Sequence, residues 1–292
     1  MVNPREDQAE GLRRLLSFSR TRTVAVVAGT RGAGATSCVT NLAAALSRQG
    51  SRVLVVDENF DTNVSHALGL HPRHDLKHVI QGEVALEHAL LRGPAGISLL
   101  AAATAARTLP RLDHAAQARA IDCFAELDHI ADIVLLDVRN DGDEPSPFAA
   151  AAQEVIVVVS PGSASITGGY AAVKRMCHTH GRKRFRLLVN RAQDYANVRT
   201  AEANMREVAK KHLDVELEVM DAVPLDPAVL ISARRFRAAV DAAPHSAASR
   251  RFCDHAAGML RWSAEPDDAS RLDTFMQRAI HGSRYPAARA GV

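Results

Sequence analysis

The chain has 292 residues, of which 47% are hydrophobic and 24% are charged, a composition typical of a globular protein with a sizeable core. Aromatic residues make up only 4%, which argues against a stacking platform for single-stranded nucleic acid, and the formal net charge of +3 neither requires nor excludes an anionic partner. The four cysteines form no Cys-x-x-Cys pair, so their spacing predicts no zinc or iron–sulfur site. Without a secretory signal or a run of 18 apolar residues, we expect a cytoplasmic protein.

The first segment, residues 1–21, predicts a short amphipathic helix ahead of the main domain. One helical face between residues 7 and 18 carries Ala9, Leu12, Leu15 and Leu16. Gly11 lies in the middle of this helix and costs about 1 kcal/mol relative to alanine. We therefore expect the helix to need a partner surface.

Short apolar runs rich in β-branched residues alternate with helical patterns over residues 22–265. The predicted strands cover residues 23–28, 52–56, 97–101, 132–136, 154–159, 186–189 and 216–223. The predicted helices cover residues 41–48, 115–129, 166–179 and 200–212. This alternation predicts one α/β domain with a doubly wound, mostly parallel sheet of about seven strands, and the alternating pattern of the last strand places it at a sheet edge.

A glycine-rich turn follows the first predicted strand and precedes a helix: Gly29, Thr30, Arg31, Gly32, Ala33, Gly34, Ala35, Thr36 and Ser37. Such a turn directs backbone N–H groups and a helix N-terminus into one concavity, which suits a phosphate. The Walker pattern G-x-x-x-x-G-K-[ST] fits residues 29–36, except that Ala35 replaces the lysine. A tight turn without a ligand is the other interpretation.

Two predicted strands lead to aspartates at the same edge of the sheet. Asp57 follows the second strand and Asp137 follows the fourth, and Thr36 adds a hydroxyl from the glycine-rich turn. Together the three residues could hold Mg²⁺ directly or through water. Alternatively, both aspartates only end buried strands and cap the turns that follow.

The last segment, residues 266–292, predicts a second amphipathic helix after Pro266. Its apolar stripe consists of Ala269, Leu272, Phe275, Met276, Ala279 and Ile280. Weak contact with a membrane surface is one interpretation, although the acidic residues of the helix balance its basic ones. Docking on the protein's own surface is the other.

Taken in order over residues 22–262, these motifs resemble the MinD/ParA group of P-loop ATPases with a deviant Walker A loop. The matching segments are the glycines at 29, 32 and 34 with Thr36, Thr40-Asn41-Leu42-Ala43, residues 53–59, residues 132–137, Asn190-Arg191 and Pro224-Leu225-Asp226. The resemblance implies that residues 29–37, Asn190, Pro224 and Asp226 contact ATP or ADP, and that Asn190 contacts adenine. It also implies a homodimer.

Within that group, the chain resembles the FlhG (FleN) family of flagellar-number regulators. The segment Asp7-Gln8-Ala9-Glu10-Gly11-Leu12-Arg13 is similar to the N-terminal motif with which that family engages the signal-recognition-type GTPase FlhF. The resemblance thus implies partner-binding roles for Asp7, Gln8, Ala9, Leu12 and Arg13. Residues 158–174 also match a family segment, with Gly168 where aspartate is usual.

The departures from the family pattern affect the chemistry. Thr30 and Ala35 take the places of the two loop lysines, and Arg31 is the one cation left in the loop. Asn59 stands where the family has its catalytic aspartate, and Asp61 is a candidate substitute. An amide cannot act as a general base, and phosphoryl transfer depends on cationic stabilisation, so we expect weak or no ATP hydrolysis.

Three functions follow from these patterns. The first is a FlhG-like regulator that acts through an FlhF-like GTPase, a flagellar transcription regulator or a basal-body protein, in the cytoplasm or peripherally at the membrane or cell pole. The second is a working ATPase switch that dimerises on ATP. The third is a DNA-partitioning ParA relative, but the short basic runs at 182–184, 234–237 and 250–251 are typical of a solvated face, so we expect no specific nucleic acid.

Overall fold

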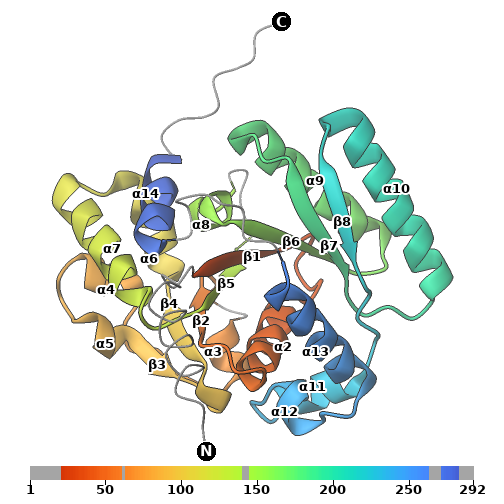
Figure 1. Ribbon diagram of the computed structural model, residues 1–292, viewed down its shortest axis with the longest axis horizontal. Helices are drawn as coiled ribbons and strands as arrows, with labels where there is room; N and C mark the ends of the chain where they lie inside the picture. The colour runs from red at the N-terminus through yellow and green to blue at the C-terminus, as the bar shows by residue number, and fades with distance from the viewer. Residues whose placement is uncertain (1–20, 61–62, 140–144, 263–270, 283–292) are drawn as a thin grey trace, which may run out of the picture.

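The computed structural model describes residues 21–60, 63–139, 145–262 and 271–282, and an eight-stranded sheet forms its centre (Figure 1). The strand order is β3-β4-β2-β5-β1-β6-β7-β8. The strands are β1 (Arg22–Ala28), β2 (Val53–Asp57), β3 (Leu90–Arg92), β4 (Ser98–Ala101), β5 (Ile133–Val138), β6 (Glu154–Val159), β7 (Arg184–Val189) and β8 (Glu216–Met220).

All neighbouring strands pair in parallel except β3, which is antiparallel to β4. The predicted α/β class and mostly parallel sheet are therefore confirmed, and β8 lies at an edge as its alternating pattern indicated. The eighth strand, β3, was missed. It is only three residues long, and none of its side chains is fully buried, so it has no continuous apolar run.

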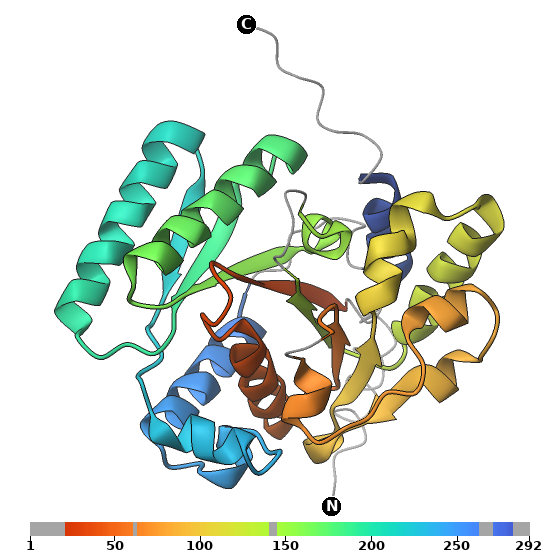
Figure 2. The ribbon, with the colours of Figure 1, turned by 180° about the vertical axis from the view of Figure 1, so that it is seen from behind.

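Helices cover both faces of the sheet, as Figures 1 and 2 show from opposite sides. Alternate residues of β1 face the two layers: Ala25 and Val27 point to one, Val24 and Val26 to the other. The first layer contains α4 (Leu76–Ile80), α5 (Leu86–Ala89), α6 (Ala103–Thr108), α7 (His114–Leu127), α8 (Pro147–Ala151), α9 (Ser163–His180), α10 (Tyr195–Leu213) and α14 (Leu272–Gly282). The second contains α2 (Ala35–Arg48), α3 (Val64–Ala67), α11 (Pro227–Ala233), α12 (Ala239–Ala242) and α13 (Ala247–Leu260).

The helix α2 begins six residues earlier than the pattern predicted, at Ala35 instead of Asn41. Thr40 and Asn41 are buried, which disrupts the amphipathic pattern expected of a helix. Their side chains instead donate hydrogen bonds to the main-chain carbonyls of Thr36 and Ser37, one turn earlier, at 2.8 Å each. The early start brings the N-terminus of α2 directly to the glycine-rich turn.

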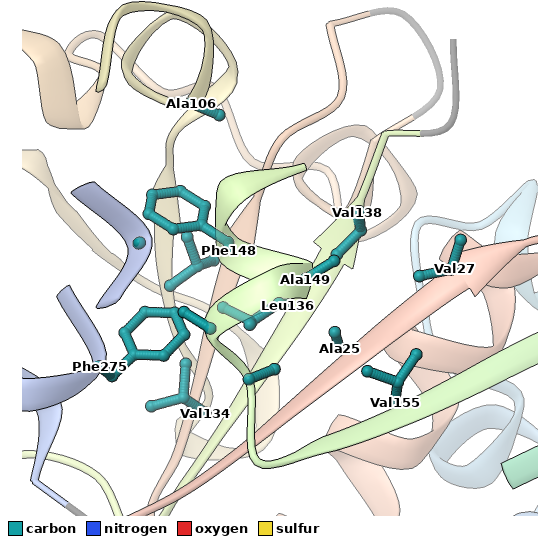
Figure 3. Close-up of a cluster of buried hydrophobic side chains, with 14 of the residues drawn as sticks. Ala25, Val27, Ala106, Val134, Leu136, Val138, Phe148, Ala149, Val155 and Phe275 are labelled. Carbon is teal, nitrogen blue, oxygen red and sulfur yellow. The ribbon is translucent and has the colours of Figure 1, made fainter. Parts of the chain in front are cut away.

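The C-terminal helix α14 packs against the protein's own α7 and α8 (Figure 1). The ring of Phe275 stacks with those of Phe124 and Phe148, with centroids 5.7 and 5.9 Å away. Figure 3 shows Phe148 and Phe275 beside Val134 and Leu136 of β5. Because the apolar stripe from Leu272 to Ile280 is buried, docking on the protein's own surface is the interpretation that the structure supports, and the stripe does not face outward toward a membrane.

Among the described residues, no helix combines the length and the apolar character needed to cross a bilayer.

Candidate functional site

The carboxyl ends of β1, β2, β5 and β7 bring most of the predicted site residues to one edge of the sheet. The glycine-rich turn follows β1, Asp57 ends β2, Asp137 lies near the end of β5, and Asn190 follows β7. Parallel strands direct their carboxyl ends to the same side, where open α/β sheets bind ligands.

The turn between β1 and α2 has the conformation of a phosphate-binding loop. Gly32 and Gly34 adopt φ values of 88° and 93°, which side chains with a Cβ rarely adopt. Within the described part of the chain, no side chain caps the start of α2, and its first turn contains no acidic residue. The N–H groups at this helix start are therefore suited to an anion.

The helix α9 approaches the loop too closely for larger residues at two positions. A Cβ on Gly29 would lie 2.6 Å from the main-chain oxygen of Ser165, and one on Gly168 would lie 2.1 Å from that of Gly29. Gly168 is the position at which the resembling family has aspartate. Its lack of a side chain is thus a requirement of the packing of α9 against the loop.

The loop itself carries little positive charge. Thr30 is half-buried and Arg31 is exposed. Ala35, the first residue of α2, is only 6% exposed and packs in the core. Neither Thr30 nor Ala35 can supply the charge of a lysine to a phosphate.

A second cation reaches the loop from the segment after β7. Arg191 donates a hydrogen bond from Nη1 to the carbonyl of Gly32 at 2.9 Å, and the neighbouring Asn190 donates from Nδ2 to the carbonyl of Ala33 at 3.0 Å. Arg191 has φ 61°, and its N–H donates to Oδ1 of Asn190 at 3.0 Å. Asn190 also lies so close to Gly34 that a Cβ there would be 2.3 Å from Nδ2. Sequence reasoning assigned no role to Arg191, because only the strand register brings it to the loop.

Pro224 and Asp226 lie on the segment that pairs with the chain just after Asn190 and Arg191. Pro224 forms a parallel bridge with Ala192, and the N–H of Leu225 donates to the carbonyl of Ala192 at 2.9 Å. Asp226 accepts hydrogen bonds from the N–H groups of Ala228 and Ala248 at 2.9 and 3.0 Å, so its carboxylate joins the starts of α11 and α13. Although burial opposes ionisation, these hydrogen bonds lower the pKa of Asp226.

Asp57 and Asp137 are neighbours in the register of β2 and β5, and both are almost completely buried. Burial raises the pKa of Asp57, against hydrogen bonds from the N–H groups of Asn59 (3.0 Å) and Val64 (2.6 Å). Burial and then the charge of Asp57 raise the pKa of Asp137 well above its ordinary value. Neither carboxylate oxygen of Asp137 has a hydrogen bond of ordinary geometry within the described residues. This site requires either a proton or a cation.

A hard divalent cation fits the donors present. Thr36, Asp57 and Asp137 offer only oxygen atoms, which is the donor type that Mg²⁺ prefers. The Thr36 hydroxyl lies close enough to Asp137 to favour its ionised form. The two carboxylate oxygens of Asp137, which lack a hydrogen bond of ordinary geometry, are the atoms that a cation would contact. These three residues therefore could hold Mg²⁺.

Asn59 joins the ends of two strands. Its side-chain Nδ2 donates to the main-chain oxygen of Asp137 at 3.0 Å, and its N–H donates to Asp57. Asn59 thus stabilises the turn after β2 and has no ionisable group with which to accept a proton. Asp61 and the predicted partner-binding residues at 7, 8, 9, 12 and 13 lie outside the described residues.

A third buried carboxylate, Glu58, was not predicted. The hydroxyl of Ser146, the N-cap residue of α8, donates a hydrogen bond to Glu58, and the guanidinium of Arg139 lies 4.0 Å away. Burial raises the pKa of Glu58 to about 7. The apolar run of β2 followed directly by two acidic residues was the one sequence signal for a buried carboxylate pair.

Comparisons with known proteins show what the chain is similar to in sequence and in fold. Residues 24–237 match the model of the CobQ/CobB/MinD/ParA nucleotide-binding domain. The chain is 32% identical to the antiactivator FleN of Pseudomonas aeruginosa over 283 residues, which cover 96% of this chain and 100% of FleN. It is 23% identical to the flagellum site-determining protein YlxH of Helicobacter pylori, over 70% of this chain and 69% of YlxH. The solved structure of MinD from Pyrococcus horikoshii with Mg-ADP superposes with a TM-score of 0.62 at 22% identity, covering 82% of this chain and 96% of that one.

Proposed function

Since the chain belongs to the CobQ/CobB/MinD/ParA nucleotide-binding family, we propose that it is a regulator of flagellar number or placement with a nucleotide site that hydrolyses ATP slowly or not at all. The names of two relatives support the regulatory part, since one is an antiactivator and the other a flagellum site-determining protein. The observation that supports slow hydrolysis is that the loop keeps its phosphate-binding backbone conformation but has no lysine at residues 30 and 35.

In this proposal, the cradle binds the phosphates of ATP or ADP through the backbone N–H groups of residues 32–37 and the N-terminus of α2. Thr36, Asp57 and Asp137 hold Mg²⁺, which would neutralise phosphate charge when bound. Asn190, Pro224 and Asp226 form the nucleoside side of the site, as the family resemblance implies.

Slow turnover follows from three substitutions in the site. Thr30 and Ala35 provide no cation for the transferring phosphoryl group, and Asn59 provides no base for the attacking water. Losing one preorganised donor can cost about 3–4 kcal/mol of transition-state stabilisation, and the losses do not simply add. Nucleotide binding depends less on these groups, because backbone donors remain.

Titration calorimetry with ATP and ADP, with and without Mg²⁺, followed by a phosphate-release assay, tests the proposal. We expect Mg²⁺-dependent binding with turnover far below that of an intact relative, and a gain in affinity in Ala35→Lys. Gly34→Ala should weaken binding, because its Cβ would lie 2.3 Å from Nδ2 of Asn190 and would displace that side chain from the loop. Gly50→Ala is the matched control, because Gly50 has a similar φ of 90° but lies at the far end of α2 with nothing within 4 Å of its Cβ. Brisk turnover by the wild-type protein, with no gain in Ala35→Lys, would overturn the proposal.

An active switch that dimerises on ATP is the second candidate. It is favoured by the intact oxygen cluster of Thr36, Asp57 and Asp137 and by the Arg191 guanidinium at the loop. Light scattering in the presence of ATP or of ADP separates the two candidates. An active switch should form a dimer with ATP but not with ADP, and this dimer should return to monomer as phosphate is released.

We further propose protein partners of three kinds. An FlhF-like signal-recognition-type GTPase would contact Asp7, Gln8, Ala9, Leu12 and Arg13, and a flagellar transcription regulator or a basal-body protein would receive the regulatory signal. The protein would act in the cytoplasm or peripherally at the cell pole. Pull-down of such a GTPase by the full chain but not by Leu12→Asp would support the first contact, and equal retention by both would exclude it.

A further inference from the structure

Exposed apolar side chains are concentrated around helix α11, outside the candidate nucleotide site. Of the nine large apolar side chains that are exposed among the described residues, four lie between residues 225 and 236: Leu225 (49%), Leu230 (58%), Ile231 (49%) and Phe236 (49%). We call these four residues, together with Arg234, Arg235 and Arg237, the α11 surface. The helix α11 packs against α12 and α13 at the edge of the second helical layer (Figure 1).

The fold holds these apolar side chains outward. Asp226 caps the start of α11, and Ser232 is the buried residue that faces the protein. Leu230 and Arg234 are four residues apart and therefore share the outer face. Phe236 adopts φ 55° in the turn after α11, and its ring packs edge-on against His66 at 5.8 Å. These contacts hold one end of the α11 surface against α3.

The same surface carries three positive charges without compensation. Arg234, Arg235 and Arg237 are exposed, and within the described part of the chain no carboxylate pairs with any of them. Asp226 is the acidic residue that begins α11, and both of its carboxylate oxygens accept backbone hydrogen bonds. A partner for this surface should therefore combine negative charge with an apolar layer.

We propose that the α11 surface binds the anionic headgroup region of a membrane, with Leu230, Ile231 and Phe236 entering the acyl boundary and the three arginines contacting lipid phosphates. Amphipathic elements with aliphatic and aromatic side chains beside arginines bind membrane interfaces in this way. A symmetric contact between two copies would place the arginines against one another, which disfavours that occupant. Duplex DNA would use the arginines but leave the apolar side chains unsatisfied. The inference is independent of nucleotide binding and of the buried helix α14.

Flotation of the full-length protein with vesicles tests the proposal. We expect binding to phosphatidylcholine vesicles that contain phosphatidylglycerol, little binding to phosphatidylcholine alone, and a decrease with added salt. Two α11 variants should each lower the bound fraction at least about tenfold: Leu230→Ser with Ile231→Ser, and Arg234→Gln with Arg235→Gln and Arg237→Gln. Matched changes on the exposed face of α10 should leave binding unchanged: Val208→Ser, and Arg199→Gln with Arg206→Gln and Lys211→Gln.

A fluorescent reporter gives a second measurement that does not depend on loss of binding. Leu230→Trp should show a blue shift in emission when anionic vesicles are added, whereas Val208→Trp should not, both read against the single native tryptophan, Trp262. Absence of flotation, equal flotation of the α11 and α10 variants, or α11-dependent binding to DNA or to an acidic protein in place of vesicles would overturn the proposal.

Discussion

Arg191 lies across the phosphate loop in a left-handed backbone conformation, which is unfavourable for a residue with a Cβ. Its guanidinium uses one donor on the carbonyl of Gly32 and has others with which to contact a phosphate. We expect Arg191→Ala to weaken ADP binding about tenfold in calorimetry, as the loss of one charge-assisted contact would. Arg31→Ala is the matched control and should have a smaller effect. A similar loss of adenosine affinity in Arg191→Ala would instead assign Arg191 to the nucleoside.

Glu58 makes stability depend on pH. Its pKa is raised by burial from 4.5 to about 7 in the folded protein, so the unfolded chain ionises first as the pH rises. The folded state is therefore destabilised progressively between about pH 4.5 and 7, by about 3 kcal/mol at most, and no further above that range. Glu58→Gln keeps an acceptor for Ser146 and should remove the part of this decline in the free energy of urea unfolding that Glu58 causes. Asp57 and Asp137, whose pKa values burial also raises, should retain the remainder.

The exposed substitution Glu87→Gln should leave the pH dependence unchanged and serves as the control for Glu58→Gln. If both variants kept the slope of the wild-type protein, Glu58 would not be the group responsible.

Residue identity alone predicted where the glycine loop, Thr36 and the two strand-end aspartates lie, because these positions follow from local sequence and strand order. The contacts of Arg191 and Glu58 could not be predicted in the same way. Each depends on a partner more than 80 residues away in the sequence: 159 for Arg191 and Gly32, and 88 for Ser146 and Glu58. Local patterns carry no information about such distant partners.

Among the elements, α14 contributes to the core through the stack of Phe275 on Phe124 and Phe148. We expect Phe275→Ala to lower the free energy of unfolding by about 3–5 kcal/mol, because it leaves a cavity in a fully buried aromatic cluster. Leu260→Ala on α13 removes a side chain that is 42% exposed and should cost less than about 1 kcal/mol. Urea unfolding of both variants checks this, and equal stabilities would mean that α14 does not complete the core.

The sequence predicted the buried strands but not the place where the C-terminal helix docks. The buried strands β1, β5 and β6 are continuous apolar runs, so their pattern predicted them to within about two residues. The docking of α14 was left open, because an apolar stripe has the same spacing whether it faces a lipid or another helix. Only the matching rings on α7 and α8 decided between them.

For the molecule as a whole, the proposed Mg²⁺ site at the two neighbouring aspartates predicts that stability depends on the cation. At about pH 8, where burial opposes the ionised forms of Asp57 and Asp137, we expect millimolar Mg²⁺ to raise the melting temperature by roughly 2–4 °C for each kcal/mol of binding free energy. Near pH 5 the effect should be smaller. Asp137→Asn should melt higher than the wild type without Mg²⁺ and lose the response to the cation.

The exposed change Asp122→Asn on α7 is the control for Asp137→Asn, and it should retain the full response to Mg²⁺. A wild-type melting temperature that is the same with and without Mg²⁺ at pH 8 would contradict the assignment of the cation site.

The docking of α14 also means that the core is completed only late in synthesis of the chain. The N–H of Leu272 bonds to the carboxylate of Asp128 at the end of α7, across 144 residues of sequence. At a translation rate of about 5–20 residues per second, a ribosome needs roughly 7 to 30 seconds to cover that interval. Until α14 has been made, the rings of Phe124 and Phe148 lack their partner Phe275, so we expect the nascent chain to bind a chaperone that shields apolar surface.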